Sequence, residues 1–374
     1  MGIKAPILKE GDPIIDIVVN SVLEATNNQL KDKDVIGITE SLVARSLGEY
    51  VTINDIVNWI QIYMGFEKTI TVVNPIYSRN RFAMILKAIA RAAKDVIIYM
   101  PDVDEVGNVR ENHPFTGLDY CKYYKQIVND EGTFCKIVKK DGRKIISGGD
   151  KTDVIYCGLH DYEKYKNVYI TLSDICNDKC DFGLLGSNKS SEEKLKLFPS
   201  SKLSQNFVEE VQKRLNDITG VNVEVMIYGD GCFKDPIGGI WEFADPVVSP
   251  GFTKGLNGTP NEIKIKAFAD DKYDNLNGDK LTDAIINEIQ NKQSDLKGNM
   301  NSQGTTPRRY VDLLGSLMDL TSGSGDKGTP IVLVRNYFKN FSNFWKSKIR
   351  RSNILDLLFF EYILNFTILK MYLI

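Results

Sequence analysis

The chain has 374 residues, with 47 lysines and arginines against 49 aspartates and glutamates, so its formal net charge is −2. This near-neutral balance argues against a nucleic acid as the main partner, because proteins that bind polyanions usually carry a basic excess. The length predicts two or three domains, and a hydrophobic content of 43% is enough to bury a sizeable core.

The first hundred residues alternate between helical and strand patterns. Asp12 and Pro13 supply a cap and a first-turn proline for a helix, and Ser78 can cap another. Apolar spacing predicts helices over Pro13–Leu30, Asn54–Met64 and Arg79–Lys94, and strands over Asp34–Thr39, Thr69–Val73 and Asp95–Met100.

The stretch Pro101–Lys166 is polar and rich in turn residues, with weak periodicity. We interpret residues 100–166 as an insertion, or as the region that shapes the pocket for an acceptor substrate. Regular patterns then return. They predict strands over Asn167–Leu172, Val221–Tyr228, Ile263–Ala269 and Ile331–Arg335, and helices over Ser204–Ile218, Leu281–Gln293 and Pro307–Leu320. Helices and strands in this order predict an α+β or mixed α/β fold.

Cysteine usage indicates a reducing compartment. Six cysteines in a chain of this length do not form a disulfide scaffold. A zinc site would need most of them, with His113 and His160, to converge, so we expect reduced thiols. The first residues lack the apolar stretch of a secretory signal, and we expect a cytoplasmic protein. The cysteines are Cys121, Cys135, Cys157, Cys176, Cys180 and Cys232.

The first candidate site is Gly229-Asp230-Gly231, which directly follows the predicted strand Val221–Tyr228. A carboxylate held at a strand end between glycines is suited to bind magnesium or manganese. The same residues are also typical of a hairpin turn, and the sequence leaves both interpretations open.

The second candidate is the glycine-rich segment Ser322–Thr329, between a predicted helix and a predicted strand. Its backbone N–H groups could form an anion-binding nest, with Ser322, Ser324 and Lys327 as further donors. The Walker A pattern is absent from the chain. A polar connection without a ligand remains the alternative.

The third candidate is Asp174-Ile-Cys-Asn177, with Asp178 and Asp181 close behind a predicted strand. Clustered oxygen donors could share a divalent metal with a second carboxylate such as Asp230. The alternative is a solvated acidic loop. With two histidines in the chain, a hydrolase triad is a poor alternative.

Taken in order, these blocks resemble the γ-glutamyl ligase family of coenzyme F-420 (F-420-0:L-glutamate ligase). Pro6-Ile-Leu-Lys-Glu-Gly-Asp12 is similar to the opening of the family, and Asp32–Gly48 is similar to its next conserved run. Asp174-Ile-Cys-Asn177 matches an Asp-x-Ser-Asn motif, and Asp312–Arg335 is similar to the final helix, glycine-rich loop and strand. The resemblance implies an α+β fold of mixed, largely antiparallel sheets with flanking helices and two intertwined subdomains.

The resemblance also assigns roles to residues. It implies metal ligands at Asp174, Asp230 and Gly231, where the family has threonine in place of the glycine. It implies nucleotide contacts at Asn177 and at Arg45, which replaces a lysine that would meet phosphate. The other implied nucleotide contacts are Lys4, Ala5, Pro6, Ile7, Glu40, Ser41, Ser322, Gly323, Ser324, Gly325, Asp326, Lys327, Gly328 and Thr329.

The implied reaction is a GTP-dependent ligation. The resemblance implies that a carboxylate-bearing acceptor is activated as an acyl-phosphate and that the amine of L-glutamate attacks it. Asp174, Asp230 and Arg45 would form the catalytic set. The implied cofactors are magnesium or manganese, with potassium as a further candidate, and the implied assembly is a homodimer. We expect neither nucleic acid nor a membrane among the partners.

Two other functions use the same residues. In a metal-dependent phosphohydrolase the carboxylates would activate water, and nucleotide cleavage would not require glutamate. In a nucleotide sensor, binding would occur without turnover.

The C-terminal segment differs from the rest of the chain. Residues 353–374 are strongly apolar and follow a basic stretch, a pattern long enough to span a bilayer. Asp356, Glu361 and Lys370 interrupt it, and each charge costs about 2.5–3.5 kcal/mol at the bilayer centre. We therefore expect a catalytic unit over residues 1–338, and over residues 339–374 a docked amphipathic helix or a terminus altered by a change of reading frame.

Overall fold

The computed structural model describes residues 1–104, 107–112, 117–144, 153–159, 162–229, 232–234, 241–243, 247–258, 265–291, 309–322 and 328–339. The chain divides into two compact units, one of Met1–Asn257 with Tyr310–Arg335 and one of Gly258–Arg309 with Asn336–Ile374. The predicted boundary at residue 338 stays a prediction, and residues 340–374 of the apolar C-terminal segment lie outside the described residues.

The first sheet of the larger unit has four strands and joins segments from both ends of the chain. Strand β14 is antiparallel to both of its neighbours, whereas β11 is parallel to β2. The strand order is β1 (Gly2–Ile3), β14 (Ile331–Val334), β2 (Val35–Thr39) and β11 (Glu224–Tyr228).

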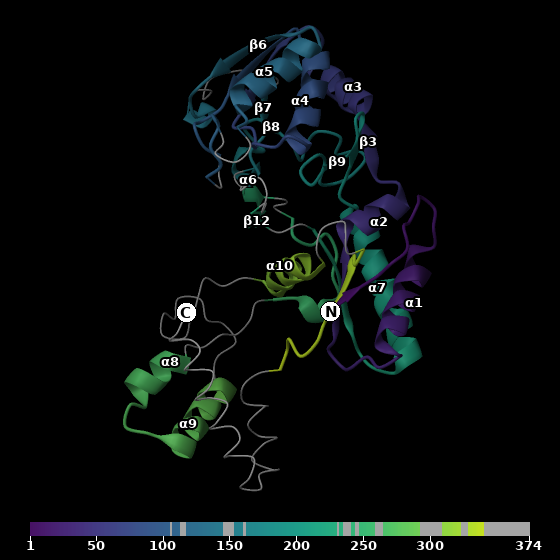
Figure 1. Ribbon diagram of the computed structural model, residues 1–374, viewed down its shortest axis with the longest axis vertical. Helices are drawn as coiled ribbons and strands as arrows, with labels where there is room; N and C mark the ends of the chain where they lie inside the picture. Colours follow the sequence, from purple (N-terminus) through teal and green to yellow (C-terminus); the bar gives the residue numbers. More distant parts are fainter. Residues whose placement is uncertain are drawn as a thin grey trace. The chain divides into compact units, whose positions relative to one another are not determined.

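Helices cover both faces of this sheet. The side chains of β2 point alternately to the two faces of the sheet. On one face, Ile36 and Ile38 pack in a core with α1 (Ile14–Thr26) and α7 (Ser201–Thr219), two helices that lie side by side in Figure 1. Gly37 points to the opposite face. A Cβ added there would lie 2.1 Å from the Met318 sulfur of α10 (Tyr310–Ser322). The missing side chain therefore lets α10 pack closely on the sheet.

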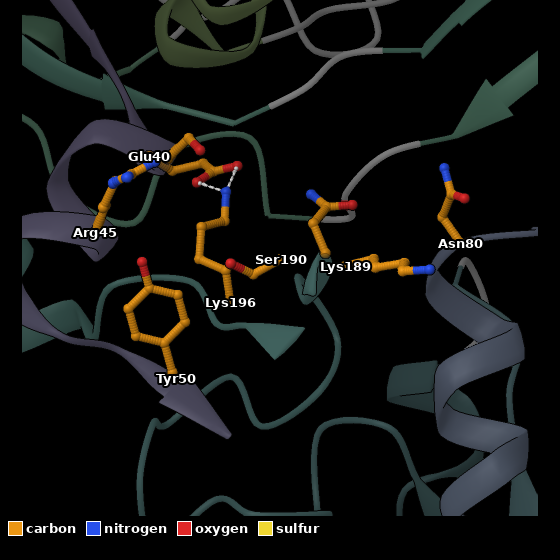
Figure 2. Close-up of a pocket in the computed structure, with 9 residues that line it drawn as sticks. Glu40, Arg45, Tyr50, Asn80, Lys189, Ser190 and Lys196 are labelled. Atoms are coloured by element: carbon orange, nitrogen blue, oxygen red, sulfur yellow. Dashed lines mark hydrogen bonds and ion pairs between the residues drawn. The ribbon is translucent and has the colours of Figure 1, made fainter. Parts of the chain in front are cut away.

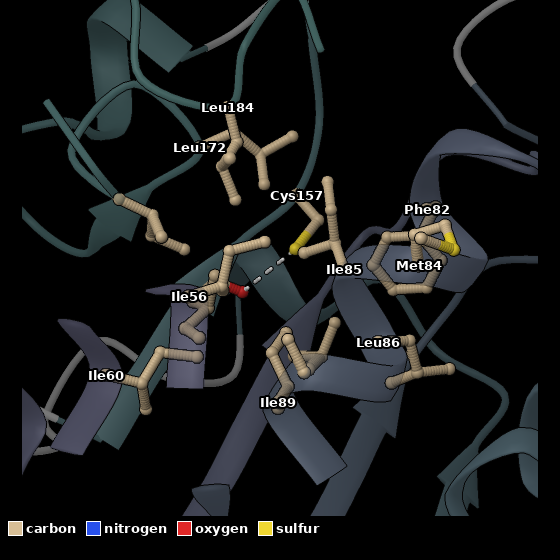
Figure 3. Close-up of a cluster of buried hydrophobic side chains, with 14 of the residues drawn as sticks. Ile56, Ile60, Phe82, Met84, Ile85, Leu86, Ile89, Cys157, Leu172 and Leu184 are labelled. Atoms are coloured by element: carbon tan, nitrogen blue, oxygen red, sulfur yellow. Dashed lines mark hydrogen bonds between the residues drawn. The ribbon is translucent and has the colours of Figure 1, made fainter. Parts of the chain in front are cut away.

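The second sheet has five strands, and all of its pairings are parallel. Three helices pack against it: α3 (Ile53–Met64), α4 (Arg81–Ala92) and α5 (Tyr120–Asp130). Ile56 and Ile60 of α3 meet Ile85 and Ile89 of α4 in its core (Figure 3). The strand order is β6 (Phe134–Val138), β5 (Asp95–Tyr99), β4 (Thr69–Val73), β7 (Val154–Tyr156) and β8 (Ile170–Thr171).

A small antiparallel sheet follows the short helix α2 (Glu40–Leu47). It consists of β3 (Tyr50–Thr52), β10 (Lys194–Lys196) and β9 (Asn188–Ser191), with β10 in the centre. Its buried residues Val51 and Leu195 join the core of the parallel sheet. The remaining elements of the larger unit are the hairpin β12 (Cys232–Lys234) and β13 (Trp241–Phe243), helix α6 (Tyr162–Tyr165) and the 3₁₀ turns Gly142–Lys144 and Lys254–Leu256.

The predicted α+β class with mixed sheets is confirmed. The expectation of largely antiparallel sheets is wrong for the largest sheet, which is entirely parallel. The reason is that α4 and α5 connect successive strands, and a parallel pair needs such a crossover. The chain builds part of the first core, then the second core, and returns to the first with α7, β11 and β14.

The stretch Pro101–Lys166 contains more regular structure than its pattern predicts. Helix α5 and strands β6 and β7 lie within it, and both strands belong to the parallel sheet. Helix α5 buries Tyr120, Tyr124 and Val128 at helical spacing, but its other face is polar, which weakens the signal. Whether this region is an insertion relative to the family stays a prediction.

The predicted strand Ile263–Ala269 is wrong over its described residues. In the smaller unit, α8 (Ile265–Ala267) runs into a π-helical turn, Phe268–Lys272, and α9 (Gly278–Asn291) follows. The Tyr273 hydroxyl donates to Glu288 of α9 at 2.6 Å, so contacts with the next helix override the alternating pattern. In the described part of the chain, no helix has the length and apolar character needed to cross a membrane.

Candidate functional site

At one edge of the first sheet three strands end and a fourth begins. Strand β1 ends at Ile3, opposite Ile331, where β14 begins. Ile331 also lies opposite Ile38, one residue before the end of β2. Strand β11 ends at Tyr228, which lies opposite Thr39. The residues that follow β1, β2 and β11, and those that precede β14, therefore emerge together.

Backbone hydrogen bonds join these segments. The Ala5 N–H donates to the Gly328 carbonyl at 3.3 Å, and the Thr39 N–H donates to the Pro330 carbonyl at 2.9 Å. The structure thus brings Lys4–Ile7, the start of α2 and the end of the glycine-rich segment together, although the glycine-rich segment lies more than 280 residues after the other two.

The ends of the glycine-rich segment are tied to each other. The Thr329 hydroxyl donates at 2.5 Å to the carbonyl of Ser322, which is the last residue of α10. Gly328 has a positive φ of 59°, which favours glycine. Gly323, Ser324, Gly325, Asp326 and Lys327 lie outside the described residues.

Helix α2 begins with a buried ion pair. Glu40 is 1% exposed and Lys196 of β10 is 8% exposed. The Lys196 ammonium donates to Glu40 Oε1 at 2.9 Å and to Oε2 at 2.6 Å. Glu40 is also favourably placed at the N-terminus of a helix, where negative charge is stabilised.

A pocket of about 460 Å³ opens beside this pair. Figure 2 shows that its walls come from α2, from the small sheet and from the residue before α4. Arginine, lysine, hydroxyl and amide groups dominate the lining, so a hydrophilic anion fits it best. The lining residues are Glu40, Ser41, Arg45, Tyr50, Asn80, Asn188, Lys189, Ser190 and Lys196.

Two of these side chains are oriented by neighbours outside the pocket. The Arg81 guanidinium, which is buried, donates to Asn188 Oδ1 at 3.2 Å. This bond leaves the amide nitrogen of Asn188 as the group available to a ligand. The Tyr50 ring is covered on one side by the Lys194 ammonium, 3.9 Å from its centroid.

The structure brings Glu40, Ser41 and Arg45 of the predicted set into one pocket, with Ser41 and Arg45 exposed to solvent. Lys4–Ile7, Gly328 and Thr329 lie at the sheet edge from which α2 begins. Ile7 is 85% exposed and packs against little of the protein. These residues are therefore accessible from solvent.

Asp174 and Asn177 lie elsewhere in the larger unit, in the turn that follows β8. Asp174 Oδ2 accepts from the Thr171 N–H at 2.7 Å and from the Thr171 hydroxyl at 2.6 Å, so it caps this turn. Asn177 is exposed and Cys176 has a positive φ of 61°. Neither Asp174 nor Asn177 is among the described residues that line the pocket.

The other predicted metal ligands, Asp230 and Gly231, lie outside the described residues. Tyr228, two residues earlier, hydrogen-bonds the Pro330 carbonyl at 3.5 Å. Of the predicted ligand pair, the described residues therefore include Asp174 alone. Among those residues, no three His, Cys, Asp or Glu side chains form a group that could hold a metal.

Among the described residues, five cysteines are free thiols, and four of them, Cys135, Cys157, Cys176 and Cys180, are buried. Cys176 and Cys180 are 1% and 2% exposed, and burial raises the pKa of each thiol to about 12. The Cys180 thiol donates to the Phe198 carbonyl at 3.1 Å. No disulfide links the cysteines Cys121, Cys135, Cys157, Cys176 and Cys180, as expected for reduced thiols.

Six of the nine described residues that line the pocket were not predicted from the sequence, and they are Tyr50, Asn80, Asn188, Lys189, Ser190 and Lys196. Asn80 directly precedes α4. The other five lie on strands of three or four residues, which are too short for a periodic signal. A lysine amid the apolar run Leu195–Phe198 was the one local sign of a buried charge.

Comparison with known proteins gives one family. A model of the F420-0:gamma-glutamyl ligase family matches residues 2–336 of the chain. A search of curated proteins finds no significant match.

Proposed function

Because the chain belongs to the F420-0:gamma-glutamyl ligase family, whose model covers residues 2–336, we propose that it is a GTP- and divalent-metal-dependent ligase. It joins the amine of L-glutamate to a carboxylate-bearing acceptor through an amide bond, and the acceptor carboxylate is activated as an acyl-phosphate. The bond is a γ-glutamyl bond where that carboxylate is the γ-carboxylate of a glutamate. The proposal names the chemical class of the acceptor and not a single metabolite.

The observation that carries this proposal is the convergence of distant segments at one sheet edge. The N-terminal segment, the start of α2 and the end of the glycine-rich segment meet there, as expected for an active site built from several loops. A hydrophilic pocket with arginine and lysine side chains adjoins the start of α2. These features support a site for a nucleotide triphosphate.

In the proposed mechanism, cationic side chains of the pocket hold the triphosphate. Arg45 can donate to two phosphate oxygens at once, and Ser41 adds a hydroxyl beside it. Asp174 and Asp230 would hold magnesium or manganese, which when bound would neutralise charge on the phosphates. The half-buried carboxylate of Asp174 is held by Thr171 and offers the oxygen donors that such metals prefer.

Ligation then needs no protein nucleophile. The acceptor carboxylate attacks the γ-phosphate and GDP leaves, which gives the acyl-phosphate. The glutamate amine attacks the carbonyl and loses a proton to water, and phosphate leaves with the electron pair of the C–O bond that breaks. The chain's residues position three substrates and stabilise phosphate charge, which accounts for most of the catalysis in phosphoryl transfer.

The test is release of phosphate from GTP with manganese or magnesium, with and without L-glutamate and acceptor. The proposal predicts release that requires both substrates, and Asp174→Asn lowers it by at least tenfold. Asp217→Asn, which changes an exposed aspartate of α7 outside the candidate site, is the matched control and keeps full activity. Glutamate-independent release would favour a phosphohydrolase, and binding without release would favour a nucleotide sensor.

A further inference from the structure

The described lining of the pocket carries three cations and one acid. The cations are Arg45, Lys189 and Lys196, and the acid is Glu40. The other lining groups are hydroxyls and amides, which can all donate hydrogen bonds. This lining is suited to an anion with several oxygen atoms.

Lys196 differs from the other two cations because it is buried. Lys189 is exposed and pairs with Glu192 at 2.5 Å, and Arg45 is exposed as well. The side chain of Lys196 is 10% exposed and that of Glu40 is 2% exposed. A buried cation with a fixed partner lies at one position, whereas exposed cations move with their side chains.

An ammonium group has three N–H donors. The ammonium directs two of them to Glu40, one to each oxygen of its carboxylate. The third donor is available at a pocket wall that both residues line (Figure 2). Because the position is preset, a ligand gains this hydrogen bond without ordering the side chain.

We propose that Lys196 binds a phosphate oxygen of the nucleoside triphosphate and that Glu40 acts as the positioning residue for the Lys196 ammonium. The inference rests on the proposed function, because that function makes Ser41 and Arg45, in the same pocket, contacts of the nucleotide. It adds to that function a cation contributed by the small sheet, from a strand that lies outside all the segments assigned by resemblance.

The alternative is that the pair only ties α2 to β10. A double variant separates these two roles. Replacing both members of a buried ion pair by apolar side chains of similar size often preserves stability, whereas removing one partner does not. Glu40→Met combined with Lys196→Met therefore keeps the packing but removes the proposed phosphate contact.

The experiment measures binding of inorganic tripolyphosphate by calorimetry in a metal chelator, so that side chains alone contribute. We expect the full-length chain to bind tripolyphosphate and the double variant to bind at least about tenfold more weakly, with a melting temperature within a few degrees of the original chain. Glu209→Met combined with Lys213→Met, which removes one exposed acid and one exposed base of α7, changes the net charge as little as the double variant does, and it leaves the affinity unchanged.

Equal affinity in the double variant, or no binding by the original chain, would overturn the proposal. If the double variant does not fold, a crystal structure of the original chain with tripolyphosphate decides the matter. Lys196 Nζ within about 3 Å of a phosphate oxygen supports it, and a bound tripolyphosphate that does not touch Lys196 refutes it. These readouts contain no GTP turnover, so failure of the ligase assay leaves them interpretable.

Discussion

One residue of the pocket, Glu40, has three structural roles. Glu40 is at once the first residue of α2, the partner of a buried lysine and part of the pocket lining. Arg45 lies on the next turn of the same helix and has no burial to constrain it. Glu40 therefore has a fixed position in the wall of the pocket, whereas the side chain of Arg45 can adapt to a ligand.

Arg45 is the residue whose substitution most directly reports on nucleotide binding. A hydrogen bond to a charged group contributes about 1.5–3 kcal/mol, so Arg45→Met should raise the Michaelis constant for GTP by at least about tenfold. Arg45→Lys should stay within about threefold, because a lysine keeps the charge but loses the bidentate contact. Steady-state kinetics checks both variants, and an unchanged Michaelis constant in Arg45→Met would remove it from the site.

At the scale of elements, a partly exposed ion-pair network joins α4 to neighbouring segments of the second core. Arg91 donates to Glu131 at 2.6 Å and to Glu193 at 2.9 Å, and Lys87 pairs with Glu193 at 2.5 Å. Glu193 lies in the turn between β9 and β10. The network therefore ties the helix to the hairpin that carries Lys189 and Lys196.

This network makes stability depend on pH in the acid range. Hydrogen bonds from Arg91, then from Lys87, lower the pKa of Glu193 from 4.5 to about 2. A carboxyl with a lowered pKa in the folded state stabilises the fold above its unfolded pKa, and this contribution disappears as the pH falls toward about 2. Because the Glu193 side chain is 53% exposed, the contribution is about 0.5–1 kcal/mol.

We therefore expect Glu193→Gln to lower the free energy of unfolding by about 0.5–1 kcal/mol at pH 7 and by less at each step below pH 4.5. Urea titrations of both proteins across this range measure the difference. Glu24→Gln, which changes an exposed glutamate of α1, serves as the control and should leave the free energy of unfolding unchanged at every pH. A difference that stays constant with pH would contradict the role of the Glu193 carboxylate.

The loop that carries Asp174 closes on a glycine. Gly183 has a φ of 53°, and a Cβ added there would lie 2.6–2.7 Å from the carbonyl oxygens of Leu172, Ser173 and Ile175. Backbone atoms cannot move aside as a flexible side chain does. The loop conformation around Asp174 thus depends on the absence of a side chain at residue 183.

Gly183→Ala should therefore destabilise the protein by about 2–3 kcal/mol, from the strained φ and from the clash with the backbone. Gly132→Ala is the matched control, since its φ is 80° but nothing lies within 4 Å of the added Cβ. It should cost about 1 kcal/mol. Equal losses in the two variants, measured by chemical denaturation, would show that the loop tolerates a side chain.

At the scale of the whole molecule, the family match and the apolar C-terminal segment occupy different parts of the chain. The match ends at residue 336, and residues 353–374 are strongly apolar. We expect a chain truncated after Phe338 to keep its melting temperature and its ligase activity. Thermal unfolding and phosphate release check this, and loss of either would assign residues 339–374 to the functional unit.

Much of the architecture could be predicted from the sequence, because long elements carry a clear apolar period. Strand β4 was predicted with the observed bounds, and α3 and α7 within three residues. The parallel order of the second sheet could not be read, since pairing between distant strands leaves no local pattern. Three of the nine described residues that line the pocket, Glu40, Ser41 and Arg45, were predicted, because they lie in a segment that resembles the family. Lys196 could not be connected with them, because it lies 156 positions after Glu40 in the sequence.

The most direct measurement of the central claim is the mass of the acceptor after incubation with GTP, manganese and L-glutamate. The proposed ligase predicts a product heavier by one glutamyl residue, formed only when all components are present, together with one GDP and one phosphate for each amide bond. Phosphate release without any change in the mass of the acceptor would contradict it.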